Sequence, residues 1–236
     1  MPAPLVMLPG MMCDARLFSS QTNAFSSMRT IIHAPLTRGR TMTELAESVL
    51  LETPPEFALL GLSMGGIVAM EMMRLAPERV TRLALLDTNP LAETPETATL
   101  REPQIVAARA GKLEEVMRDE MKPRYLAPGP KQSYVLDQVM EMARAHGPDV
   151  FVRQSRALQK RIDQTETLKK ITVPTLVLCG EYDTLCDVRR HEFMRSLIPG
   201  ASLEVVAGAG HLPVMERPEA TNGALERWLT DTLLLK

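Results

Sequence analysis

The stretch that decides the fold is residues 57–75, which read FALLGLSMGGIVAMEMMRL. Residues 57–60 form a short, continuous apolar run, typical of a strand that is buried on both faces of a parallel sheet. A glycine-rich turn follows and leads directly into an apolar segment, 67–75, which predicts a helix that ends near Pro77. A strand that passes through a tight turn into a helix is the repeating unit of α/β folds.

The same alternation continues on both sides of this stretch. Further strands are predicted at 5–8, 30–34, 80–86, 175–180 and 202–206, and further helices at about 14–27, 188–198 and 218–234, with another that begins after Thr43 and stops at Pro54. Because parallel strands need a crossover connection, this order indicates an α/β fold with a mostly parallel sheet and helices on both faces.

The alternation is interrupted between residues 92 and 165, where no strand-like run occurs. Helical segments are predicted there at about 97–110, 112–121, 131–145 and 148–160, separated by glycine or proline. We therefore expect a core formed by 1–91 and 166–236, with a helical insertion at 92–165. Its many charged residues are expected mostly on solvated helix faces.

Composition excludes several classes of protein. Of the 236 residues, 45% are apolar and 24% are charged, which is ordinary for a globular protein and argues against disorder. The formal net charge of -2 offers no basic surface for nucleic acid. No apolar run is long enough to predict a membrane span, and residues 1–10 lack the basic leader of a signal peptide. The expected partner is a small-molecule substrate, with no nucleic acid and no membrane; the oligomeric state is left open.

The cysteines bear on metal binding and on cellular setting. Cys13, Cys179 and Cys186 show no spacing typical of a metal site or of a disulfide framework. We therefore expect no metal and a reducing, cytoplasmic setting.

The turn after the central strand matches the pattern G-x-S-x-G, as Gly61-Leu62-Ser63-Met64-Gly65. In this context the pattern is typical of a nucleophilic serine, because a strand–turn–helix elbow exposes the hydroxyl of Ser63. The helix start adds N–H groups and a positive dipole end, which suit a developing anion. The alternative is a serine that caps an ordinary helix.

A serine nucleophile needs a general base, and the chain has four histidines. His211 is favoured, because it lies in the loop 208–213 after the last predicted strand, at the edge of the sheet where ligands bind. His33 in a strand, His146 at a helix end and His191 on a helix surface are the alternatives.

The base in turn needs an acid that orients it. Asp183 is favoured, because it follows the strand at 175–180 and lies at the same edge of the sheet. Asp187 is better placed to cap the next helix. Asp87 also ends a strand, but the turn sequence after it predicts a local Asx turn.

Acyl transfer also requires hydrogen-bond donors for the oxyanion. One is expected from the backbone N–H of Met64, directly after Ser63. The other is expected from Met11, where Gly10 permits close approach of the backbone. The alternative is that Pro9-Gly10 forms only a turn.

Four segments together resemble the α/β-hydrolase superfamily, in particular its small esterases and enol-lactonases with a helical cap. These segments are Leu8-Pro-Gly-Met-Met-Cys-Asp14, Gly61-Leu-Ser-Met-Gly-Gly66, Pro174-Thr-Leu-Val-Leu-Cys-Gly-Glu-Tyr-Asp183 and Gly208-Ala-Gly-His-Leu-Pro213. The order of Ser63, Asp183 and His211 along the chain is also that of this family.

The resemblance implies a serine hydrolase that works without a cofactor and cleaves a carboxylic ester, lactone or thioester through an acyl-enzyme. It assigns Ser63 as nucleophile, His211 as proton relay and Asp183 as the orienting acid, and it makes 92–165 a cap over the pocket. The 16 methionines suit a deformable apolar pocket, so a small apolar substrate is expected.

Two departures and several alternatives accompany this interpretation. Pro9-Gly10 stands where many relatives have His-Gly, and the antiparallel strands that usually precede the first parallel strand are missing. The same three residues also occur in lyases, cofactor-free oxygenases and perhydrolases, which are alternatives to a hydrolase. A further alternative is a ligand-binding protein of this fold without turnover.

Overall fold

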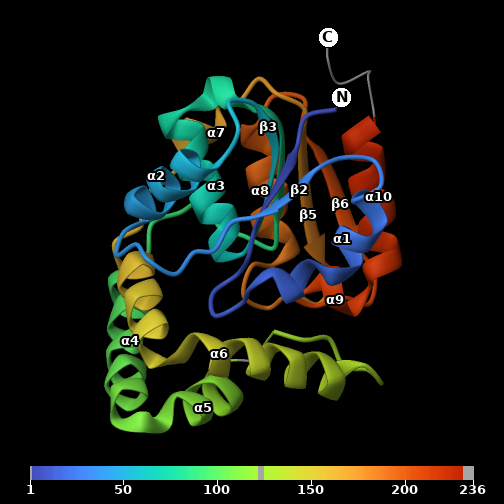
Figure 1. Ribbon diagram of the computed structural model, residues 1–236. Coiled ribbons are helices and arrows are strands. Elements are labelled where there is room, and N and C mark those ends of the chain that lie inside the picture. The colour runs from blue at the N-terminus through green and yellow to red at the C-terminus, as the bar shows by residue number, and fades with distance from the viewer. Residues whose placement is uncertain (1, 122–124, 231–236) are drawn as a thin grey trace.

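A computed structural model describes residues 2–121 and 125–230 of the chain (Figure 1). Its centre is a six-stranded sheet in the order β2-β1-β3-β4-β5-β6, and every neighbouring pair is parallel. The strands are β1 (Leu5–Leu8), β2 (Ile31–His33), β3 (Phe57–Leu62), β4 (Val80–Leu86), β5 (Thr175–Gly180) and β6 (Ser202–Val206). The expected parallel sheet is confirmed, and no antiparallel strand precedes β1 within these residues.

Helices cover both faces of the sheet (Figure 1). One face carries α2 (Met42–Glu52), α3 (Met64–Leu75), α7 (Thr165–Leu168) and α8 (Val188–Leu197). The other carries the 3-10 turn η1 (Ala15–Phe18), α1 (Ser19–Phe25), α9 (Pro213–Glu216) and α10 (Pro218–Thr230). The short turn η2 (Pro77–Arg79) leads into β4.

The two-sided covering explains the continuous apolar strands. Along β1, Val6 and Leu8 belong to one hydrophobic cluster, whereas Leu5 and Met7 belong to the cluster on the opposite face. Each fully buried side chain of this size stabilises the fold by about 1.5–3 kcal/mol relative to exposure. The sheet is therefore a rigid base from whose carboxyl edge the loops project.

A helical segment separates β4 from β5. It comprises α4 (Pro95–Ala107), the π-helical turn η3 (Ala108–Lys112), α5 (Leu113–Glu115), the π-helical turn η4 (Val116–Met121) and α6 (Gln132–Gln159). In Figure 1 these helices lie below the carboxyl edge of the sheet. Helix α6 bends at Gly147, whose φ is 74°, because Pro148 cannot continue the hydrogen-bond ladder.

The structure differs from the sequence-based expectation at a few boundaries. Thr41, rather than Thr43, caps α2, and its hydroxyl accepts a hydrogen bond from the N–H of Glu44. The π-helical turns, α7 and α9 are too short or irregular to leave a periodic signal. Residues 231–234 of the last predicted helix lie outside the described residues. Among the helices described, none is long and apolar enough to cross a bilayer.

Candidate active site

Ser63 occupies a strained turn between β3 and α3. Its φ of 55° and ψ of -116° lie in a region that side-chain-bearing residues rarely adopt, at a cost of about 1–3 kcal/mol. Two hydrogen bonds of the Ser63 backbone hold this turn. The N–H of Ser63 donates to the carbonyl of Leu86 (2.9 Å), and the carbonyl of Ser63 accepts from the hydroxyl of Thr88 (2.7 Å). The elbow expected from the motif is therefore present.

The two glycines of the motif are required by close backbone contacts. A Cβ on Gly61 would lie 2.3 Å from the carbonyl oxygen of Gly65, and one on Gly65 would lie 2.1 Å from that of Leu8. Both distances are well inside van der Waals contact. Gly61 therefore lets the turn that carries Ser63 close on itself, and Gly65 lets the end of β1 pack directly against that turn.

Three side chains from distant parts of the chain form a continuous hydrogen-bond relay. Nε2 of His211 lies 2.8 Å from Oγ of Ser63, and Nδ1 of His211 lies 2.8 Å from Oδ2 of Asp183. Because the carboxylate of Asp183 accepts a hydrogen bond from Nδ1–H, Nε2 is left as the acceptor for the Ser63 hydroxyl. Asp183 and His211 are buried, at 4% and 2% exposure.

Asp183 is held as an anion. Its Oδ1 accepts hydrogen bonds from the N–H groups of Leu185 (2.8 Å) and Cys186 (3.0 Å). Burial raises the pKa of the carboxyl, but the attraction to His211 and these hydrogen bonds outweigh burial, so the pKa of Asp183 is lowered from its usual value.

The loop that carries His211 is fixed by two residues that the sequence analysis missed. The N–H of His211 donates to the carbonyl of Tyr125 (2.6 Å), whose ring packs against the imidazole at 5.1 Å between centroids. The carboxylate of Glu216 accepts from the N–H groups on either side, those of Gly210 (3.1 Å) and Leu212 (3.0 Å). Tyr125 is far away in the sequence and Glu216 lies in a one-turn helix, so no local pattern marks either residue.

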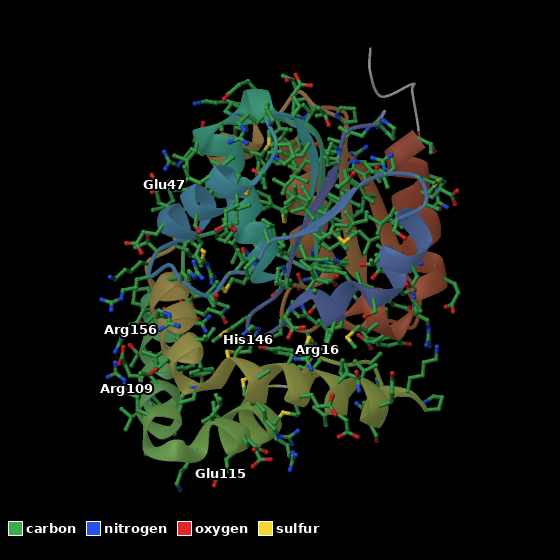
Figure 2. All side chains as sticks on the ribbon, viewed as in Figure 1. Arg16, Glu47, Arg109, Glu115, His146 and Arg156 are labelled. Carbon is green, nitrogen blue, oxygen red and sulfur yellow. The ribbon has the colours of Figure 1, made fainter. Side chains whose placement is uncertain are left out.

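The other histidines have structural partners. His33 ends β2 and pairs with a threonine hydroxyl. His146 lies on α6, and its Nε2 bonds the carbonyl of Cys13 (3.0 Å), which joins the helical segment to the core (Figure 2). The surface position expected for His191 is wrong: it is fully buried, and its Nε2 accepts from the N–H of Thr88 (3.1 Å). It thereby joins α8 to the end of β4.

The two alternative acids also have other roles. Asp187 caps α8, because its carboxylate accepts from the N–H of Arg190 (3.0 Å). The Asx turn expected of Asp87 is wrong, since Asn89 makes that turn instead. Asp87 is fully buried, and its Oδ1 accepts from the N–H of Gly180 (2.9 Å), between the ends of β4 and β5. Burial, and secondarily the negative charge of Asp183, raise the pKa of Asp87 well above its usual value.

We expect the stabilising effect of Asp87→Asn to increase with pH. Unfolded Asp87 ionises at about pH 4. Because the pKa of folded Asp87 is raised, the stability of the wild type falls by up to about 1.4 kcal/mol per pH unit as the pH rises between the unfolded and the folded pKa. An amide does not ionise and removes this dependence. Urea unfolding of both proteins at pH 4.5 and 7 measures it, and a difference in unfolding free energy that stays constant with pH would contradict the assignment.

Ser63 and His211 open into a cavity of about 330 Å³. Its apolar lining includes Met11, Met64 and Leu158, the last of which comes from α6. A volume of this size accommodates a small molecule. The predicted site residues Ser63, His211, Met11 and Met64 therefore meet at one cavity, and Asp183 lies directly behind it.

One group of side chains has potential metal ligands. The ligand atoms of Asp183, Cys186 and His211 lie within 4.8 Å of one another. However, both ring nitrogens of His211 are already hydrogen-bonded, and burial together with Asp183 raises the pKa of the Cys186 thiol well above its usual value. A metal would need a thiolate and a vacant ring nitrogen, so the donor set suits a proton relay better.

The sequence as a whole matches a known family. A sequence model of the alpha/beta hydrolase family matches residues 14–224, which is most of the chain. The chain belongs to the alpha/beta hydrolase family. Curated relatives include the pimeloyl-[acyl-carrier protein] methyl ester esterase of Photobacterium profundum, 29% identical over 182 residues, which covers 75% of this chain and 71% of the relative. That of Salmonella agona is 28% identical over 198 residues, covering 78% and 74%.

Two solved structures are similar to this chain over nearly its whole length. A thermophilic esterase from Thermogutta terrifontis, solved with malate bound, superimposes with a TM-score of 0.91 at 26% identity, covering 97% of this chain and 90% of that one. The enol-lactonase from Burkholderia xenovorans LB400 gives a TM-score of 0.86 at 22% identity, covering 98% and 92%. At that identity the second likeness shows the fold alone.

Proposed function

We propose that this alpha/beta hydrolase cleaves a carboxylic ester through an acyl-enzyme on Ser63. The observation that carries the proposal is the relay from Asp183 through His211 to Ser63, which ends at the cavity with 2.8 Å at each step. The relatives in question are named as esterases, which supports cleavage of an ester bond.

The chemistry follows from the position of the protons. Oγ of Ser63 attacks the ester carbonyl while its proton moves to Nε2 of His211, and the anion of Asp183 stabilises the imidazolium that results. Collapse of the tetrahedral intermediate breaks the bond to the alcohol, whose oxygen takes the proton from Nε2. A water molecule, deprotonated by His211, then attacks the acyl group, releases the acid and restores the Ser63 hydroxyl.

Two backbone N–H groups are suited to hold the oxyanion. Met64 follows the nucleophile at the start of α3, and Met11 lies in the loop after β1; both residues line the cavity. Within the described residues neither N–H has a hydrogen-bond acceptor. Unpaired N–H donors on residues that line a cavity beside the nucleophile suit an oxyanion.

Gln154 of α6 fixes the loop that carries Met11. Its Oε1 accepts from the N–H of Met12 (2.9 Å), a residue with a φ of 58°, and its Nε2 donates to the carbonyl of Leu36 (2.8 Å). Gln154 is only 1% exposed. The helical segment therefore helps to shape the proposed oxyanion site.

We expect Gln154→Leu to lower kcat for ester hydrolysis more than it changes KM. The substitution leaves the N–H of Met12 without its acceptor, and loss of an oxyanion donor costs about 10²–10³ in kcat at most, so a displaced donor costs part of that. Stability falls by about 1–3 kcal/mol. Steady-state kinetics measures the effect, with the exposed Gln132→Leu at the start of α6 as control. A rise in KM alone would contradict a role for Gln154 in the oxyanion site.

The helices of residues 92–165 act in this proposal as a cap over the cavity, because Leu158 and Arg101 both line it.

The cytoplasmic setting is proposed from the cysteines: none of the three forms a disulfide, which fits a reducing compartment.

A panel of p-nitrophenyl esters and lactones tests the proposal. We expect turnover of short neutral esters by the wild type and none above background by Ser63→Ala. Equal turnover by both proteins, or none by the wild type with any ester or lactone, would overturn it in favour of lyase, oxygenase, perhydrolase or binding chemistry.

A further inference from the structure

The wall of the Ser63 cavity carries three guanidinium groups. Arg101 comes from α4, Arg161 from the segment that follows α6, and Arg190 from α8. The side chains of Arg101 and Arg161 are only 15% and 11% exposed, so these two are exceptions to the solvated helix faces expected for most charges of this segment. Three separate parts of the chain thus direct positive charge into one small cavity.

The positive charge is only partly balanced. Glu93, whose side chain is fully enclosed, is the one carboxylate among the lining residues described. Its oxygens accept from Nε of Arg101 (3.1 Å) and from Nη1 of Arg161. Three guanidinium groups against one carboxylate leave two positive charges. Burial, and in part the charges of Arg101 and Arg190, lower the pKa of Arg161, whereas Glu93 opposes the shift.

Several donors of these arginines remain available. Within the described residues, no acceptor is found for Nη1 of Arg101, Nη2 of Arg161, or Nε and Nη2 of Arg190. Arg190 makes a single long hydrogen bond, from Nη1 to Oδ1 of Asn89 (3.3 Å). A guanidinium fork of this kind matches the two oxygens of a carboxylate or phosphate.

We propose that Arg101, Arg161 and Arg190 form an anion subsite, so that the substrate of this esterase carries a carboxylate or phosphate group in addition to the ester. The inference rests on the proposed function, because it names the substrate class of the same cavity. The apolar lining between Ser63 and the arginines remains suited to a hydrocarbon chain, as expected from the methionines. A half-ester of a dicarboxylic acid combines these features.

The first test compares monomethyl glutarate with the neutral dimethyl glutarate. Charge-assisted hydrogen bonds to the second group should raise kcat/KM for the half-ester about 10- to 100-fold. A ratio at or below one would overturn the proposal. Glutarate and inorganic phosphate as inhibitors of p-nitrophenyl acetate turnover distinguish the two anions: the one that competes at lower concentration identifies the group, and inhibition by neither overturns the subsite.

Adjacent arginines of α8 provide a matched pair of variants. Arg190→Gln removes a lining guanidinium that has only one long hydrogen bond, and it should reduce the half-ester to diester ratio about tenfold. Arg189→Gln removes the same charge from an exposed side chain outside the cavity, and it should leave the ratio unchanged. Equal ratios in the two variants would show that overall charge, not the subsite, sets the preference.

A binding experiment separates this inference from the proposed function. Calorimetric titration of Ser63→Ala with glutarate measures the subsite without turnover. Binding that weakens about tenfold in the Ser63→Ala, Arg190→Gln double variant supports the subsite even if no ester is hydrolysed, whereas unchanged binding in the double variant overturns it. Absence of glutarate and phosphate binding to Ser63→Ala overturns the subsite even if neutral esters are hydrolysed.

Discussion

His211→Ala should lower kcat for ester hydrolysis by on the order of 10⁶, because loss of the base leaves Ser63 without a proton acceptor. Among the residues described, the imidazole is the only group that is hydrogen-bonded to Oγ of Ser63, at 2.8 Å. Steady-state kinetics with a p-nitrophenyl ester measures the loss, and circular dichroism verifies that the variant is folded.

Two histidines outside the cavity serve as controls. His33→Ala and His146→Ala remove hydrogen bonds of about 3.0 Å, to a threonine hydroxyl and to the carbonyl of Cys13, and neither bond reaches Ser63. These variants should keep turnover within a few-fold of the wild type. Near-normal turnover by His211→Ala, with loss of turnover in either control, would remove His211 from the role of base.

Asp183→Asn should lower kcat by on the order of 10⁴ and leave the fold intact. The amide keeps the shape of the carboxylate but neither fixes the tautomer of His211 nor stabilises its protonated form. Because the pKa of Asp183 is lowered, the anion is the form present in the native protein at neutral pH. Turnover measured at pH 7 to 8 tests this expectation.

Asn variants of two nearby acids, Asp187 and Asp87, serve as controls that show whether the loss of kcat is specific to Asp183. Asp187→Asn weakens the cap of α8 and should cost on the order of 1 kcal/mol of stability with little effect on kcat. Asp87→Asn replaces a buried carboxyl, whose pKa is raised, by a neutral group of the same shape, so kcat should change little. If Asp187→Asn or Asp87→Asn is the inactive variant instead, the acid has been assigned to the wrong residue.

Much of the fold could be predicted because the central strands β1, β3 and β5 are buried on both faces. The predicted bounds 80–86, 175–180 and 202–206 agree with β4, β5 and β6. The run at 175–180 is apolar and buried, whereas β6 is a partly exposed edge strand whose valines and flanking turns indicate its bounds. The helical segment was harder to predict. Its breaks at Gly111 and at Gly147, before Pro148, fall where glycine and proline predicted them, whereas the π-helical turns leave no periodic signal in the sequence.

The candidate site could be predicted where a local motif and the strand order coincide. Ser63, Asp183 and His211 each follow a strand of the parallel sheet, and the carboxyl ends of such strands meet at one edge. Their roles stay a prediction until they are tested by variants.

The supporting residues could not be predicted, because their partners are distant in the sequence. Gln154 accepts a hydrogen bond from Met12 across 142 positions of the chain. Glu216 accepts from backbone N–H groups, which nearly every residue has, so the sequence does not mark its partners. The burial of Arg101 and Arg161 depends on the enclosed carboxylate of Glu93, and a charge count along the chain does not reveal such a cluster.

Labelling with a fluorophosphonate probe tests the central claim most directly, because the probe reacts only with an activated serine. We expect peptide mapping of the folded protein to find one adduct, on Ser63, with no adduct in Ser63→Ala and a strongly reduced rate in His211→Ala. An adduct on another serine, or no adduct on the folded wild-type protein, would contradict the assignment of Ser63 as the nucleophile.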